Sequence, residues 1–181
     1  MSDALAECIF HARHTICGKR LQPFTLWHAW LLDFCESPFI DTTRPGAAAD
    51  LALAIEICSQ PASSPARCQK INLHPSARLI RQIFDKGFKE TAAAFRAYLA
   101  DHVSLPRCWE NGGGRPIRSH IALYSVAVLM RHGRRTEHEA WATEYGYARH
   151  LVLALAEAGG NEIPILSAAE EAALKEAGHV L

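Results

Sequence analysis

The sequence predicts an all-α protein, folded as a compact irregular bundle of about six to eight helices. Three observations carry this prediction. Apolar residues recur at the spacing of a helical face in most segments between Pro and Gly breaks. Two capping boxes of the form S/T-x-x-E mark helix starts. The alternation of apolar and polar residues that is typical of strands is nearly absent.

Size and charge limit the classes of protein that fit. A chain of 181 residues and 20.0 kDa fits one helical domain over residues 1–181. A Gly/Pro-rich connector leaves open a division into residues 1–103 and 116–181. Lys plus Arg equals Asp plus Glu at 19 each, so no overall field attracts nucleic acid or an anionic membrane.

Compartment follows from two further patterns. The first residues lack a signal peptide's basic flank and apolar core, and no run reaches the roughly 18 apolar residues of a membrane span. The six cysteines are irregularly spaced within apolar helical patterns, which indicates free thiols. We therefore expect a cytoplasmic protein without membrane contact.

The segment from Leu21 to Ile40 predicts the helix around which the others pack. Pro23 is unsuited to a helix interior, Thr25 suits an N-cap, and Ser37-Pro38 ends the segment. With about 100° per residue, an arc of about 140° holds the residues expected to face the core. These are Leu26, Trp27, Trp30, Leu31 and Phe34, with Ala29, Asp33 and Glu36 on the other side. Leu32 projects toward the polar side, where a monomer would carry a charge.

The flanking segments are less uniform. Residues 2–14 fit a short helix, although the following I-C-G-K-R-L fits an extended segment equally well. Ala47 to Ser59 predicts a second helix, and the prolines of Gln60 to Pro75 predict a loop.

Two more apolar stripes follow, separated by Gly87, where a break is cheapest. The stripes consist of Leu79, Ile80, Ile83 and Phe84, and of Phe88, Ala92, Phe95 and Leu99.

The helix from Ile117 to Arg131 is apolar on most of its circumference, so we expect it in the middle of the bundle. Gly133 suits the left-handed position that ends it. Thr136 to Glu139 is a capping box, and a helix from Tyr145 to the A-G-G-N stop follows. A second capping box, S-A-A-E, predicts a final helix through about Ala177.

One cluster has the donor atoms of a zinc site: Cys8, His11, His14 and Cys17. Steps of three residues drift by about 60° each on a helix, so these side chains would not converge on one ion. We interpret them as ordinary helix residues and expect no metal.

No other stretch carries a catalytic motif. His138-Glu139 lacks the second histidine of a metalloprotease, and N-G-G-G-R-P lacks the lysine of a phosphate-binding loop. We interpret His28 as a hydrogen-bonding residue of a helix flank. We expect a non-catalytic protein without a cofactor.

Two stretches carry a resemblance. L-Q-P-F-T-L-W-H followed by an apolar helix and S-P-F resembles the opening of phage tail assembly chaperones and related phage proteins. From Leu129, L-M-R-H-G-R-R-T-E-H-E-A-W, an Ala-rich helix and G-G-N-E-I-P-I-L-S are similar to their carboxy-terminal half. The likeness covers about half of the chain, in residues that cap and pack helices.

The resemblance implies a helical protein of the host cytoplasm that keeps the tape measure protein soluble until tail tube subunits assemble around it. Such a protein is absent from the finished virion. A chaperone for a long apolar helix needs an exposed apolar surface, and we expect Trp27 and Leu32 to form it. Self-association is left open.

The alternative is a small helical phage accessory or DNA-binding regulatory protein. It would contact phosphates through Arg131, Arg134 and Arg135. The neutral charge of the chain favours a solvated helix end for these arginines.

Overall fold

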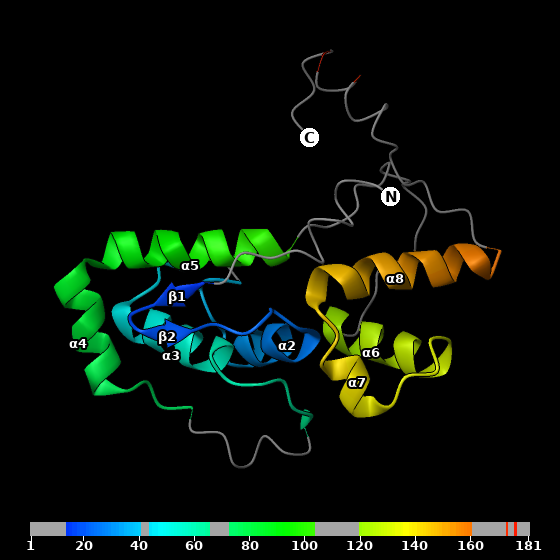
Figure 1. Ribbon diagram of the computed structural model, residues 1–181, viewed down its shortest axis with the longest axis horizontal. Helices are drawn as coiled ribbons and strands as arrows, with labels where there is room; N and C mark the ends of the chain where they lie inside the picture. The colour runs from blue at the N-terminus through cyan, green and yellow to red at the C-terminus, as the bar shows by residue number, and fades with distance from the viewer. Residues whose placement is uncertain are drawn as a thin grey trace.

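The computed structural model describes residues 14–40, 44–65, 73–103 and 120–160, together with positions 173 and 176. Within these residues the chain forms seven helices and one short hairpin, which confirms the predicted all-α class (Figure 1). In chain order the elements are β1 (Thr15–Ile16), β2 (Lys19–Arg20), α2 (Leu26–Phe34), α3 (Ala48–Cys58), α4 (Ala77–Lys86), α5 (Phe88–His102), α6 (Ile121–Arg131), α7 (Glu137–Trp141) and α8 (Tyr145–Ala158).

The hairpin precedes the first described helix. β1 and β2 pair antiparallel with Ile16 opposite Lys19. Cys17 and Gly18 connect them with φ values of 49° and 73°. Positive φ at both central positions gives the tight turn that matches the twist of paired strands. The extended interpretation of I-C-G-K-R-L is therefore confirmed. The helix expected over residues 2–14 lies outside the described residues, which begin at His14.

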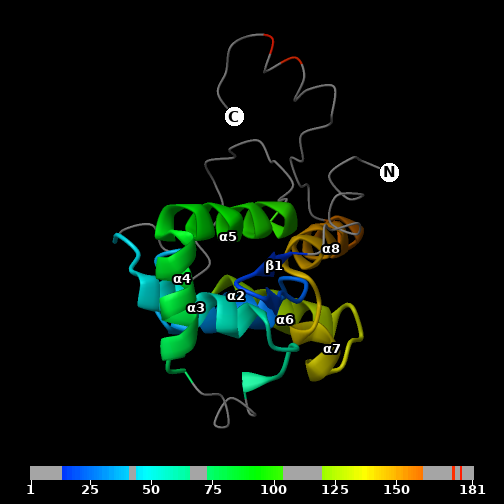
Figure 2. The ribbon, with the colours of Figure 1, turned by 60° about the vertical axis from the view of Figure 1, so that its left-hand side comes forward.

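Helix α2 lies in the middle of the molecule, between α3 and the group formed by α6, α7 and α8 (Figures 1 and 2). It begins after Thr25, as predicted. The backbone N–H of Thr25 donates to Nδ1 of His28 over 3.1 Å. This bond satisfies a backbone donor that a helix start would otherwise leave unpaired.

The expected inward arc of α2 is only partly correct. Leu26 and Leu31 are buried, but Phe34 is 64% exposed and Ala29, expected to face outward, is buried. Because α2 has helices on two sides, a single apolar arc does not describe its buried surface.

Helices α3, α4 and α5 form the part of the molecule at the left of Figure 1. α3 confirms the predicted second helix and packs against both α4 and α5. Gly87, with φ of 95°, separates α4 from α5, which confirms the predicted break. The buried residues of α4 are Leu79 and Ile83, whereas Phe84 is 67% exposed, contrary to its place in the predicted stripe.

Helix α6 packs against α2, α7 and α8, in line with its predicted place in the bundle. Its inner residues are buried: Ala122, Ser125, Val126 and Leu129. Part of its apolar circumference nevertheless faces outward, because Leu123, Tyr124 and Met130 are 43%, 39% and 42% exposed.

The end of α6 also differs from the prediction. The left-handed residue is Arg134, with φ of 52°, and not Gly133. Gly133 is needed for a different reason: a Cβ atom there would lie 2.7 Å from the carbonyl oxygen of Leu129. The close approach of two backbone segments therefore explains the glycine.

The last two described helices agree with the sequence. In the capping box before α7, the N–H of Thr136 donates to Oε2 of Glu139 over 2.9 Å. The N–H of Glu139 donates back to Oγ1 of Thr136 over 3.3 Å. α8 ends at the predicted Gly-Gly stop, with Gly160 at φ of 86°. The second capping box lies outside the described residues, and of the predicted final helix only positions 173 and 176 are described, both of them helical.

Candidate functional site

A groove of about 610 Å³ opens where α2, α5, α6 and α8 meet. We call it the interhelical groove. In Figure 1 it belongs to the region where the end of α5 approaches the start of α8, above α2. Its lining is mostly apolar and comprises Phe24, Ala29, Asp33, Phe39, Ile40, Leu99, Ala100, Val103, His120, Ile121 and Tyr145.

The wall of the groove at Phe24 is held rigidly. The Phe24 ring is 1% exposed and makes ring contacts with Tyr98 and Tyr145 at centroid distances of 6.2 and 5.8 Å. The N–H of Tyr145 donates to the carbonyl oxygen of Phe24 over 2.8 Å, and the N–H of Leu26 donates to that of Thr143 over 3.0 Å. These bonds tie the start of α2 to the start of α8, so the wall between them is preorganised.

A polar contact between two side chains lies in the groove. Nε2 of His120 is 3.1 Å from Oδ2 of Asp33, and the Asp33 side chain is 49% exposed. Nδ1 of His120 accepts the backbone N–H of Ala122, so the histidine also caps α6. The imidazole therefore joins the end of α2 to the beginning of α6.

The chemistry of the lining favours binding. Its titratable side chains are Asp33, His120 and Tyr145, and burial raises the pKa of the Tyr145 phenol. Among the described lining residues there is no Ser, Cys or Lys that would act as a nucleophile. A half-open apolar surface of this size takes several apolar side chains of a partner or a small ligand.

Behind the groove lies a buried cluster around His28, whose ring is fully enclosed. Nε2 of His28 lies 2.9 Å from the carbonyl oxygen of Gln60, and Nδ1 lies 2.9 Å from Oγ1 of Thr25. Because a carbonyl only accepts, the proton is on Nε2 and Nδ1 receives the Thr25 N–H. The prediction that His28 is a hydrogen-bonding residue is confirmed.

Burial lowers the pKa of His28 from 6.5 to about 4. The Gln60 carbonyl opposes this shift, and the nearby His102 adds to it. A proton on Nδ1 would also face the Thr25 N–H donor, which is a further reason for a neutral ring. His28 is thus a neutral structural group.

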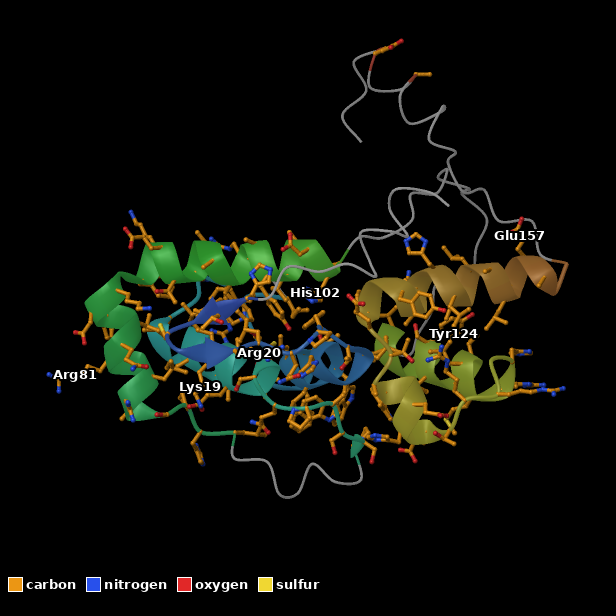
Figure 3. The ribbon with its side chains drawn as sticks, in the orientation of Figure 1. Lys19, Arg20, Arg81, His102, Tyr124 and Glu157 are labelled. Carbon is orange, nitrogen blue, oxygen red and sulfur yellow. The ribbon has the colours of Figure 1, made fainter. Side chains whose placement is uncertain are left out.

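The same cluster contains Tyr98, His102 and Cys58. The Tyr98 hydroxyl donates to the carbonyl oxygen of Gln22 over 2.8 Å, and Nδ1 of His102 donates to that of Tyr98 over 2.8 Å. His102 points from α5 into the molecule (Figure 3). Burial raises the pKa of the Cys58 thiol from 9.0 to about 12, so this cysteine is an unreactive core residue.

The expected client surface is wrong in its location. Trp27 and Leu32 both have 0% of their surface exposed. Both residues belong to α2, which packs against α3 and also against α6, α7 and α8. The side of α2 that was expected to face water is therefore covered by other helices. These two residues are part of the core and offer no surface to a partner in this fold.

The three arginines expected to contact phosphates under the DNA-binding alternative differ in their exposure and contacts. Arg131 and Arg134 are exposed. Arg135 is half-buried: its Nη1 donates to Oγ1 of Thr143 over 2.9 Å, and its guanidinium lies 6.0 Å from the centre of the Tyr147 ring. Arg135 therefore joins α8 to the turn before α7.

The cysteine and histidine motif is only half described, since Cys8 and His11 lie outside the described residues. Nε2 of His14 lies 2.7 Å from Oδ2 of Asp101, and Cys17 is buried in the hairpin turn. The described residues contain no group of three or more potential metal ligands.

Sequence patterns did not reveal the interhelical groove. Its residues come from four helices and from positions beside them, namely Phe24, Phe39, Ile40, Val103 and His120. No local signal marked His120 either, because the predicted helix began at Ile117, whereas the structure places His120 as the cap of α6.

Comparison with known proteins found no matching family model, no matching curated protein and no matching solved structure. In the part of the chain that the structure describes, no helix is long and apolar enough to cross a membrane.

Proposed function

We propose that this protein is a non-catalytic phage tail assembly chaperone that binds the tape measure protein and keeps it soluble in the host cytoplasm. The resemblance of the segments around L-Q-P-F-T-L-W-H and L-M-R-H-G-R-R to such chaperones suggests the role. The interhelical groove is the observation that carries it, because an open apolar groove between helices suits the apolar face of a helical client.

The groove replaces Trp27 and Leu32 as the proposed client surface. Ile40 is 38% exposed, Ala100 is exposed, and both line the groove. A client helix would cover them and place its apolar side chains against Phe39 and Val103. Asp33 at the same surface would select a client with a basic residue beside its apolar stripe. Tail tube protein is the second proposed partner, which would displace the chaperone when its subunits assemble around the tape measure protein.

The DNA-binding alternative gains no support from the arginines. Arg135 is already engaged with Thr143 and Tyr147, and the chain has equal numbers of acidic and basic residues. A salt series would separate the two functions. DNA binding falls steeply as salt rises, whereas apolar client binding changes little.

The experiment is co-expression with the long helical phage protein encoded near the gene. We expect the wild-type protein to keep this client soluble and to co-purify with it. The variant Ile40→Asp with Ala100→Glu should lose both effects, because it places carboxylates in the groove.

Phe84→Asp is the matched control. It also replaces an exposed apolar residue by a carboxylate, but on α4, away from the groove (Figure 1). Circular dichroism should show native helix content for both variants. Undiminished client solubility with the groove variant, or equal loss with Phe84→Asp, would reject the groove as the client site.

A further inference from the structure

The outer face of α6 consists of Leu123, Tyr124, Ala127, Met130 and Arg131, all of which are exposed. With about 100° per residue, the other four lie within about 60° on either side of Ala127. A helix face turned to water normally carries charges of both signs, whereas this one has four uncharged residues and a single arginine. It is an apolar face that the described part of this chain leaves uncovered.

Its residues are arranged symmetrically about Ala127. Leu123 and Met130 lie on one side of the face, and Tyr124 and Arg131 lie on the other. Two such helices can pack face to face and antiparallel about a two-fold axis that passes between their Ala127 residues, perpendicular to both helix axes. The axis leaves each residue on the same side of the face and moves it to the opposite end of the helix. Leu123 then faces Met130 of the second copy, and Tyr124 faces Arg131.

Both contacts are chemically favourable. Leu123 and Met130 bury apolar surface, and a guanidinium over the Tyr124 ring makes a cation–π contact. The small Ala127 at the centre allows the two helix backbones to approach closely. Each contact occurs twice because the axis relates the copies.

Charge at the ends of α6 supports the same partner. Asp33 is half exposed and lies next to His120, at the amino-terminal end of α6. Arg131 and Arg134 are exposed at the carboxy-terminal end. An antiparallel second copy brings these arginines to the Asp33 end of its neighbour, about 6 Å along the axis from Ala127 for Arg131. A parallel arrangement would place arginines beside arginines.

We propose that the outer face of α6 is the interface of a two-fold symmetric dimer of this chain, with Ala127 on the symmetry axis. The contact area of one helix face is small, so the dimer is weak and depends on concentration. The inference rests on the outer face of α6 and on the charges of Asp33, Arg131 and Arg134 near its ends, and it does not depend on the proposed client.

Sedimentation velocity from about 1 to about 100 μM tests this, since small interfaces associate in this range. The wild-type protein should shift from monomer to dimer as concentration rises. Ala127→Glu places two carboxylates on the axis and should weaken association more than about tenfold. Ala97→Glu, at an exposed position of α5, should leave it unchanged. A wild-type protein that stays monomeric, or a dimer indifferent to Ala127→Glu, would overturn the proposal.

Disulfide trapping keeps the test independent of a loss of stability. In the Ala127→Cys variant, the new cysteines of the two copies should form a disulfide with each other under mild oxidation. Mass spectrometry of the linked peptides is needed to locate this disulfide, because the chain has other cysteines. Leu123→Cys alone should not, because its two copies lie about 12 Å apart along the axis. A mixture of Leu123→Cys and Met130→Cys chains should link to each other. Linkage of Leu123→Cys to itself with none at position 127 would contradict the antiparallel dimer.

Discussion

Nδ1 of His28 lies 3.1 Å from the backbone nitrogen of Thr25, so a neutral imidazole caps the helix at the middle of the molecule. An Asp or Glu often fills this role at a helix start, because a carboxylate accepts hydrogen bonds at any neutral pH. The histidine accepts only while it is unprotonated. The start of α2, and with it the groove wall at Phe24, is therefore sensitive to acid.

The first prediction concerns pH. The folded pKa of His28, about 4, is below the unfolded value of 6.5, so the unfolded chain binds the extra proton between these values. The contribution of His28 to the free energy of unfolding is fully present above pH 6.5 and falls by about 3 kcal/mol as the pH drops toward 4. Urea unfolding at pH 7.5, 6 and 5 measures this. His28→Gln, which does not titrate, should flatten that part of the profile. A His28→Gln profile as steep as that of the wild type would contradict the prediction.

The second prediction follows from the burial of Leu32. Leu32→Ala should destabilise the protein by about 2–5 kcal/mol, the usual cost of truncating an enclosed leucine. Phe34→Ala on the same helix should cost much less, because the Phe34 side chain is 64% exposed. Chemical denaturation of both variants gives the comparison. Equal small effects would mean that Leu32 is accessible, as the sequence pattern had indicated.

The third prediction concerns the end of α6. Gly133→Ala should cost about 1–3 kcal/mol, because the new Cβ would meet the Leu129 carbonyl oxygen at 2.7 Å. Thermal unfolding detects a change of this size. A Cβ atom at Gly160 would have no neighbour within 4 Å, so Gly160→Ala should show only the cost of its positive φ. An unaffected Gly133→Ala variant would show that the turn moves freely.

The fourth prediction concerns thiol reactivity. With a pKa near 12 and no exposed surface, Cys58 should resist alkylation in the native protein at pH 8. It should react at the ordinary rate once the chain is unfolded in urea. Isotope-coded alkylation followed by mass spectrometry reads each cysteine separately. Rapid native labelling of Cys58 would show that the core around Tyr98 opens.

Local patterns in the sequence predicted much of the fold. The N-cap at Thr25, the capping box at Thr136, the break at Gly87 and the stop at Gly160 all involve residues within a few positions of each other. Their signals depend on backbone chemistry that is the same in any tertiary context. These features can therefore be predicted from the sequence without knowledge of the tertiary packing.

Features that depend on packing between distant segments were not predicted. Leu32 appeared exposed because one helix viewed alone has one apolar side, and nothing in the sequence of α2 indicates a layer on each side. Phe34 appeared buried for the same reason. The groove joins residues as far apart in sequence as Phe24 and Tyr145. Its existence depends on tertiary contacts, so no periodicity could locate it.

The most direct test of the central claim is hydrogen–deuterium exchange of the complex with the tape measure protein. If the groove binds the client, backbone amides near Ile40, Val103 and Ile121 should exchange more slowly in the complex than in the free protein. Amides of α4 should be unchanged. A complex that protects α4 and leaves the groove amides at their free rates would contradict the account.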